Sequence, residues 1–164
     1  MQAAPSFINT VKNITMKTKV NEISISYSGN LKTQNLPKIT CSNDAVALLF
    51  NNWDKGSIGL HETFKILLLN NSNKVKGIYT LSSGGITGTL VDVRILFAVL
   101  LKSLSTAVIL AHNHPSGNNH PSEADKQLTK KITKGGEYMD IKVLDHLIIT
   151  PDGDYFSFAD EGIL

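Results

Sequence analysis

The stretch AHNHPSGNNHPSEAD, from Ala111 to Asp125, holds the side chains best suited to binding a metal ion. His112 and His114 are two residues apart at the end of an apolar run, so in a strand their imidazoles point to the same side. Ser122 and Asp125 have the spacing of a helix N-terminus, which places the carboxylate on a rigid element. Two histidines and one carboxylate are typical of catalytic zinc, with one position left for water. We therefore predict one Zn²⁺ ion bound by His112, His114 and Asp125.

Hydrolysis at such a site needs further groups, which move a proton and stabilise negative charge. Zinc lowers the pKa of the water that it binds to about 7, but cleavage of an amide also requires a general acid/base. Glu62, at the start of an expected strand, is the candidate acid/base, and Ser122 is the candidate oxyanion donor if helix capping does not use its hydroxyl. Judged by the sequence alone, such a glutamate is more often simply exposed to solvent. The alternative for Asp125 is an acidic residue that only stabilises the first turn of a helix.

The other histidines and the single cysteine receive structural interpretations. His61 and His120 are interpreted as bystanders. Asp145 and His146 lie in an apolar strand, which favours a hydrogen-bonded core pair or support for the ligands over a second ligand set. Cys41 is also interpreted as structural. One cysteine cannot form an internal disulfide or a four-cysteine zinc site, and its free state favours a reducing, cytoplasmic compartment.

Length and charge limit the remaining classes of protein. A chain of 164 residues suits a single domain. We expect a flexible extension over 1–19, with Met1 and Met16 as alternative starts, and one domain over 20–164. A net charge of +2 is too small to argue for a nucleic-acid partner. No apolar run approaches the roughly 20 residues of a membrane span, so no membrane partner is expected.

The hydrophobic patterns predict a mixture of strands and helices. Period-2 alternation predicts a strand over 20–27, and helical spacing predicts a helix over 43–53. Two strands flanking a polar turn predict a hairpin over 62–81, followed by a glycine-rich loop over 82–89. Further along the chain, the patterns predict a helix from Asp92 to Leu104, a buried strand over 107–111, a helix from Ser122 to Gly135-Gly136, and strands over 140–150 and 155–158. Hairpins among the helices favour an α/β (α+β) domain with a mixed sheet over a doubly wound parallel fold.

The site residues resemble a known family. The run from His112 to Gly117, HNHPSG, followed by Ser122-x-x-Asp125, is similar to the JAMM signature of MPN/JAB-domain metalloproteases. More closely, the chain resembles the bacterial RadC family. The shared features are Glu62-x-Phe64, the glycine-rich turn over 82–88, PSxxD over 121–125 and LDHLII over 144–149.

The resemblance implies a cytidine-deaminase-like mixed β-sheet flanked by helices, within one domain. It also implies a zinc-dependent hydrolase in which His112, His114 and Asp125 match the ligands. Glu62 then matches the acid/base, and Ser122 the residue that stabilises the intermediate. The function expected is that of a peptidase or isopeptidase acting on a peptide or protein substrate.

The alternative is a DNA-repair or recombination accessory factor of RadC type, in which the metal site is structural or vestigial. Such a factor would show salt-sensitive DNA binding, and the substitution His114→Ala would leave that binding intact. Longer RadC proteins carry a helix-hairpin-helix module ahead of this domain. The first forty residues here lack the glycine-rich hairpins of that module, which indicates a short form. The motifs specify neither the substrate nor the oligomeric state.

Overall fold

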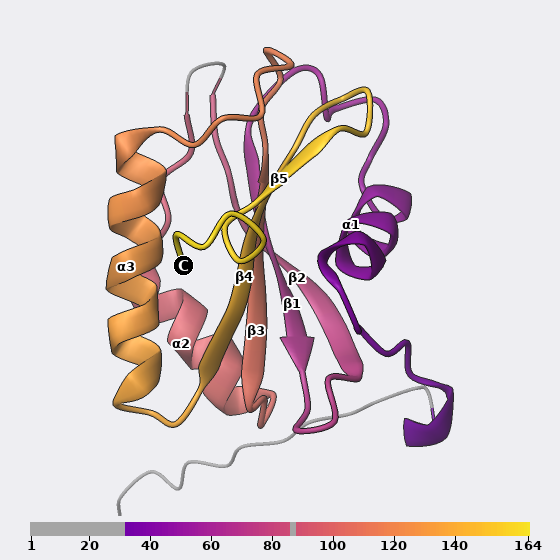
Figure 1. The fold of residues 1–164 in the computed structure, drawn as a ribbon, viewed down its shortest axis with the longest axis vertical. Helices are drawn as coiled ribbons and strands as arrows, with labels where there is room; N and C mark the ends of the chain where they lie inside the picture. Colours follow the sequence, from indigo (N-terminus) through magenta and orange to yellow (C-terminus); the bar gives the residue numbers. More distant parts are fainter. Residues whose placement is uncertain (1–31, 86–87) are drawn as a thin grey trace, which may run out of the picture.

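Five strands form one mixed sheet in the order β2-β1-β3-β4-β5 (Figure 1). They are β1 (Thr63–Leu69), β2 (Val75–Ser83), β3 (Ala107–Asn113), β4 (Lys142–Ile149) and β5 (Tyr155–Ser157). β3 and β4 are parallel, and the other neighbouring pairs are antiparallel. The predicted hairpin is therefore confirmed. The computed structural model describes residues 32–85 and 88–164, so the extension expected over 1–19 and the strand expected over 20–27 lie outside the described residues.

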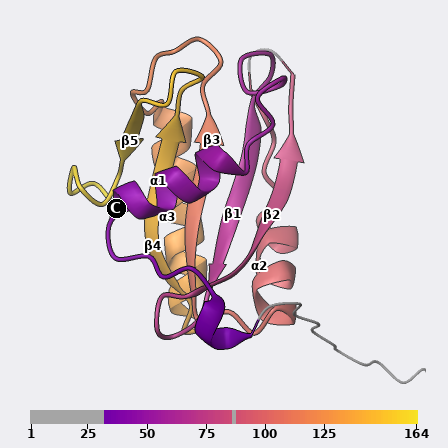
Figure 2. The same ribbon diagram turned by 90° about the vertical axis from the view of Figure 1, so that its right-hand side faces the viewer.

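Helices cover both faces of this sheet. A 3₁₀ turn (Thr33–Asn35) precedes α1 (Ser42–Asn51), which lies on one face, whereas α2 (Val93–Lys102) and α3 (Glu123–Glu137) cover the other (Figures 1 and 2). This arrangement confirms the mixed-sheet α+β domain with flanking helices. Within the described ranges, no helix has both the length and the apolar character needed to cross a bilayer.

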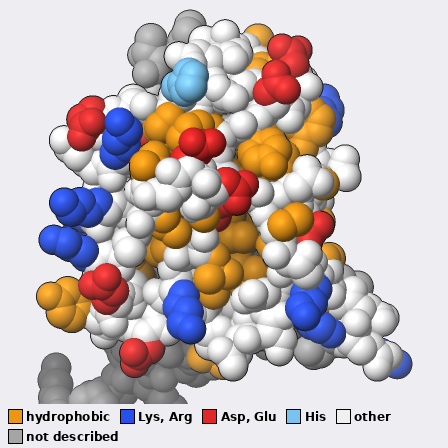
Figure 3. All heavy atoms as spheres, viewed as in Figure 1, with side chains coloured by type: hydrophobic (Ala, Val, Ile, Leu, Met, Phe, Trp, Pro, Cys, Tyr) orange, Lys and Arg blue, Asp and Glu red, His pale blue; other side chains and the backbone are white. Residues whose placement is uncertain are grey.

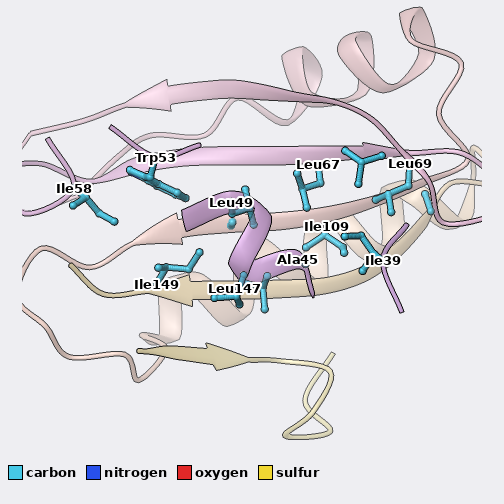
Figure 4. Packing of buried hydrophobic residues seen from close by; sticks show 14 residues of the cluster. Ile39, Ala45, Leu49, Trp53, Ile58, Leu67, Leu69, Ile109, Leu147 and Ile149 are labelled. Atoms are coloured by element: carbon cyan, nitrogen blue, oxygen red, sulfur yellow. The ribbon is translucent and has the colours of Figure 1, made fainter. Parts of the chain in front are cut away.

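β3 separates two hydrophobic cores and is buried along its whole length. Ile109 faces α1, where it packs with Ala45, Leu49 and Leu147 (Figure 4). Val108 and Leu110 of β3 point the other way. They pack against α2 and α3, with Leu96, Phe97, Leu100 and Ile132. Each such buried side chain contributes about 1.5–3 kcal/mol. A strand held between two cores gives its last residues fixed directions.

A bulge in β4 changes which side chains face each core. Val143 and Asp145 pair with consecutive residues of β3, so Leu144 is an extra residue in the ladder. An extra residue reverses the alternation of all side chains beyond it. After the bulge, His146 lies on the side of α2 and α3, and Leu147 lies on the side of α1. The bulge therefore brings His146 to the face on which His112 lies.

The glycine pair at 135–136 does not end α3, which continues to Glu137. A Cβ atom on Gly135 would lie 2.7 Å from Cε2 of Phe97 in α2, and one on Gly136 would meet the backbone oxygen of Ile141. Neither position has room for a side chain. The glycines therefore allow α3 to pack closely against its neighbours, and the helix ends one residue later than predicted.

The second helix begins as predicted but ends earlier. Asp92 is its N-cap and accepts a hydrogen bond from the backbone N–H of Arg94. Leu101 and Leu104, expected to face inward, are 51% and 70% exposed. Leu104 lies beyond the end of α2 at Lys102 and has φ 50°, so the helical spacing no longer applies to it. Leu101 is still inside the helix, but it lies beside the face formed by the buried Leu96, Phe97 and Leu100.

Candidate metal centre

The three predicted ligands come together at one end of the sheet. Nε2 of His112 lies 2.9 Å from Nε2 of His114 and 3.3 Å from Oδ1 of Asp125. One ligand atom from each residue lies within 4.8 Å of the others. Ligands at 2.0–2.1 Å from a tetrahedral zinc ion are about 3.3 Å apart. The spacing of these donors therefore fits a small cation.

His112 and His114 owe their positions to the end of β3. His112 is opposite Phe64 of β1, and the two rings stack with centroids 5.9 Å apart and planes 6° from parallel. His114 follows the strand, and its backbone N–H donates to the carbonyl of Ile149 at 3.0 Å. The turn closes at Gly117, whose φ of 80° favours glycine. Strand pairing and this turn together direct both imidazoles to one point.

Asp125 is oriented by a capping box at the start of α3. Its Oδ2 accepts hydrogen bonds from the backbone N–H of Ser122 at 2.7 Å and from the Ser122 hydroxyl at 2.6 Å. The hydroxyl in turn accepts from the N–H of Asp125 at 3.2 Å. Oδ2 is thus occupied, which leaves Oδ1 as the oxygen that faces His112.

Hydrogen bonding and burial determine which ring nitrogens of His114 and His112 carry a proton. Nδ1 of His114 lies 2.6 Å from the carbonyl of Asn118, which can only accept, so that nitrogen carries a proton and Nε2 is the nitrogen that faces His112. Burial lowers the pKa of His112 to about 4; Asp125 opposes that shift and His114 adds to it. His112 is therefore neutral near pH 7, as a metal ligand must be.

Glu62 lies in an open cleft of about 500 Å³ beside these ligands. The cleft is lined by Glu62, His114, Pro115, Ser116, Asn118, His120, Pro121 and Ser122. Burial raises the pKa of Glu62 above its usual value, while His114 lowers it and Asp125 raises it. Glu62 shares the lining of this cleft with His114, so it lies beside the ligand cluster. The structure brings together all five predicted site residues.

Asn113 holds the backbone on both sides of Glu62. Its Oδ1 accepts from the N–H of Thr63 at 2.7 Å, and its Nδ2 donates to the carbonyls of His61 and Ile58 at 2.9 and 2.6 Å. Asn113 therefore faces away from the histidines, as the alternation predicts. Its role was not apparent in the sequence because its partners lie about fifty residues away.

Ser122 does not direct its proton into the cleft. The hydroxyl is exposed and donates to Asp125, so capping uses the group proposed for the oxyanion. An oxyanion role requires this hydroxyl to rotate, and it stays a prediction.

Among the residues interpreted as bystanders, His120 is the one that lines the cleft. Its ring lies edge-on to Phe156, with centroids 6.2 Å apart. His61 contributes its backbone carbonyl to Asn113, and its side chain is not part of the cleft lining. Cys41 is exposed at the N-cap of α1.

The backbone N–H of His146 donates to Oδ1 of Asp145 at 2.7 Å, but the two side chains serve different regions. Asp145 accepts from the Ser157 hydroxyl at 2.7 Å and from the N–H of Ala159 at 3.0 Å, and burial raises its pKa. Nε2 of His146 lies 2.9 Å from Nδ1 of His112. Burial also lowers the pKa of His146 well below its usual value. Asp145 thus supports the chain after β5, and His146 contacts a ligand.

Thr129 is a second residue near the ligands that the sequence reading missed. Its Oγ1 lies 2.6 Å from Nδ1 of His146 and donates to the carbonyl of Asp125, also at 2.6 Å. Thr129 is four residues after Asp125, so the two share a helix face. That spacing is the signal that would have indicated it.

Comparison with known proteins places these features in a family. A family model described as RadC-like JAB domain matches residues 39–163. A UPF0758 protein of Flavobacterium johnsoniae is 54% identical over 130 residues, which are 78% of this chain and 54% of that protein. UPF0758 proteins of Porphyromonas gingivalis and Trichlorobacter lovleyi are 48% and 42% identical over 103 residues, 63% of this chain and 45% and 44% of theirs. The chain spans about half the length of these curated relatives.

The matched region includes the whole five-stranded sheet, the three α-helices and the cluster of His112, His114 and Asp125. More than half of the chain is covered, and the resemblance expected from the motifs is confirmed. The chain belongs to the RadC-like JAB domain family.

Proposed function

We propose that this protein is a zinc-dependent hydrolase that cleaves an amide or isopeptide bond in a peptide or protein. One observation carries the proposal: Nε2 of His112, Nε2 of His114 and Oδ1 of Asp125 converge beside an open cleft. Two imidazoles and a carboxylate fit zinc and leave a position for water. A purely structural zinc site would be closed by a fourth protein ligand.

The residues at this site have different roles in the proposed hydrolysis. Zinc, when bound, supplies a Lewis acid that makes water acidic enough to react near neutral pH. His112, His114 and Asp125 hold the ion. Glu62 takes a proton from the water and passes it to the leaving nitrogen, and a pKa raised by burial suits a group that must both accept and donate. Asn113 keeps Glu62 in place by holding its two neighbours.

The charge distribution gives less support to the DNA-binding alternative. Lys126, Lys130 and Lys134 lie along an exposed groove beside α3, but Glu123 and Glu137 flank them at either end of the helix. On the face seen in Figure 3, basic and acidic side chains are interspersed without a large area of one sign. Together with a net charge of +2, this favours a peptide substrate over a nucleic acid.

The test compares Glu62→Gln with the wild type after both are loaded with Zn²⁺. The probes are denatured casein and a fluorogenic peptide with a glycyl-lysine isopeptide bond. We expect Glu62→Gln to retain one zinc ion and to hydrolyse about 100-fold more slowly or worse, because general acid/base catalysis contributes about 10²–10⁴-fold. Glu123→Gln, which changes an exposed carboxylate at the start of the same site's helix, is the control.

Two results would overturn the proposal. The first is a wild-type protein that binds no zinc on titration. The second is a Glu62→Gln variant that hydrolyses the probes as fast as the wild type. Salt-sensitive DNA binding that persists in His114→Ala, with no hydrolysis, would support the alternative.

A further inference from the structure

A chain of three hydrogen bonds, two of them buried and one partly buried, leads from α3 to the metal-facing ring of His112. The Thr129 hydroxyl donates to the carbonyl of Asp125, and Nδ1 of His146 lies 2.6 Å from the same hydroxyl. Nε2 of His146 then lies 2.9 Å from Nδ1 of His112. Thr129, His146 and His112 are at most 3% exposed, so water is not available to replace these bonds.

The direction of each hydrogen bond follows from counting protons. A carbonyl oxygen can only accept, so the single proton of the Thr129 hydroxyl points to Asp125. The hydroxyl oxygen must then accept from His146, whose Nδ1 therefore carries the proton. A neutral His146 has no proton left for Nε2, which accepts from Nδ1 of His112. His112 is thereby left with a free electron pair on Nε2, the nitrogen that faces His114 and Asp125.

The surroundings of His146 keep its ring neutral and in place. The ring lies 4.8 Å from that of Phe158, at 21° from parallel, and 5.4 Å from that of Phe64. No carboxylate contacts it among the described residues, since Asp145 bonds only to its backbone N–H and points elsewhere. A second proton on His146 would place an unpaired charge between two phenyl rings, at a high cost.

We propose that Thr129 and His146 are positioning residues that fix the tautomer of His112, so that its Nε2 always presents an electron pair to the metal. This inference rests on the proposed function, because it assigns a purpose to the ligand cluster. The bulge in β4 is what makes the contact available, since it turns His146 toward His112. Without the hydroxyl of Thr129, His146 can move its proton to Nε2. That proton would push the proton of His112 onto the metal-facing nitrogen, where zinc must displace it.

The first experiment observes the tautomers directly and needs no metal. The full chain, labelled with ¹⁵N and treated with chelator, is studied by two-bond ¹H–¹⁵N correlation NMR. We expect His146 and His112 both to carry their proton on Nδ1. A proton on Nε2 of His112 with Nδ1 unprotonated would overturn the inference, whether or not zinc binds.

The second experiment measures zinc affinity by competition with a chromophoric chelator at one pH. Thr129→Val removes the hydroxyl at nearly constant volume, and we expect zinc affinity to fall about 10–100-fold, the usual cost of losing a group that orients a ligand. Thr129→Ser keeps the hydroxyl and should restore affinity to within about threefold. Thr133→Val is the matched control: it lies one turn further along α3, and its Oγ1 has no hydrogen-bond partner among the described residues.

The outcomes separate this inference from the function on which it rests. If the wild type binds no zinc, the proposed function fails, and NMR still decides the tautomer. If the wild type binds zinc and Thr129→Val binds it equally well, the positioning role is wrong while the proposed function stands. A loss of affinity in Thr133→Val equal to that in Thr129→Val would also overturn the inference, because it would reflect the helix and not the hydroxyl. Urea unfolding of each variant confirms that it is folded.

Discussion

His112 and Asn113 are consecutive residues at the end of β3, both are polar, and both are at most 1% exposed. Asn113 spends its polar atoms on the protein, with one bond accepted and two donated to backbone groups around Glu62. His112 uses Nδ1 in the same way but directs Nε2 toward His114 and Asp125. Because successive side chains of a strand alternate, Asn113 faces the backbone around Glu62 and His112 faces the ligand cluster.

The difference gives a criterion for interpreting buried polar residues. Buried polar groups are nearly always hydrogen-bonded, so burial by itself does not indicate function. A residue whose bonds are all made within the protein stabilises the fold. A residue that directs an electron pair toward other electron pairs needs a cation between them. By this criterion we propose that His112 belongs to a ligand site, whereas Asn113 belongs to the framework.

The largest expected effect is on the chemical side of the comparison. His114→Ala should lower zinc affinity by more than about 100-fold, because even the loss of an outer supporting group costs about 10–100-fold. The free energy of unfolding of the chelator-treated protein should change by less than about 1 kcal/mol, since the variant loses one partly exposed hydrogen bond. Chelator competition and urea unfolding measure the two quantities. Unchanged affinity would break the comparison.

Asn113→Ala should show the opposite pattern. It leaves three backbone groups of the Glu62 segment without their partner, at about 1–3 kcal/mol each, so we expect a loss of about 3 kcal/mol or more in urea unfolding. Zinc affinity of the folded fraction should stay within a few fold of the wild type. Asn52→Ala, which removes a single exposed side-chain bond, is the control and should cost well under half as much. If both variants lower the free energy of unfolding equally, the hydrogen bonds of Asn113 have no special role in the fold.

Asp145→Asn tests whether proximity to His146 in sequence matters. The amide keeps an acceptor for the backbone N–H groups but loses the one used by Ser157, so we expect a loss of about 1 kcal/mol. Zinc affinity should not change, because Asp145 supports the chain after β5 and not the ligands. A large fall in zinc affinity, measured by the same competition, would place Asp145 with His146 after all.

The smallest expected effect is a gain in stability. Burial raises the pKa of Glu62 in the folded protein, so its ionised form is less favourable there than in the unfolded chain. This cost is present above the raised pKa and vanishes below the usual value of 4.5, where the carboxyl is protonated in both states. Glu62→Gln should therefore be more stable than the wild type at pH 7.5, by less than about 1 kcal/mol because the group is only partly buried. At pH 4 the two should be equal.

Urea unfolding at both pH values, with chelator present, checks this sign. A stabilisation that is larger at pH 4 would show that the carboxylate is favoured in the fold. Glu62 would then belong with Asn113 on the structural side.

The cluster of His112, His114 and Asp125 could be predicted from the sequence because its geometry is local. His112 and His114 share a strand face through period-2 spacing, and Asp125 sits at a helix start that its own capping box specifies. Other features are not local. The position of Glu62 depends on the pairing of β1 with β3, and the orientation of His146 depends on a bulge that no residue type announces.

The error at 135–136 has a different cause. Glycine after an apolar helical pattern is the usual signal for a helix end. The same residue also permits close packing, and Phe97, which requires it at Gly135, is far away in sequence. The pattern alone does not separate these two uses of glycine.

The antiparallel pairing of β1 with β3 also determines where the chain tolerates new sequence. The site lies where Phe64 pairs with His112, whereas the hairpin turn that follows Leu69 lies at the opposite end, where Leu69 pairs with Ala107. Five residues of strand at about 3.3 Å each put roughly 17 Å between them. A reporter peptide or a whole domain inserted at Ser72 would enter the solvent far from the cleft, so this turn is the natural point of attachment for a probe of the working protein.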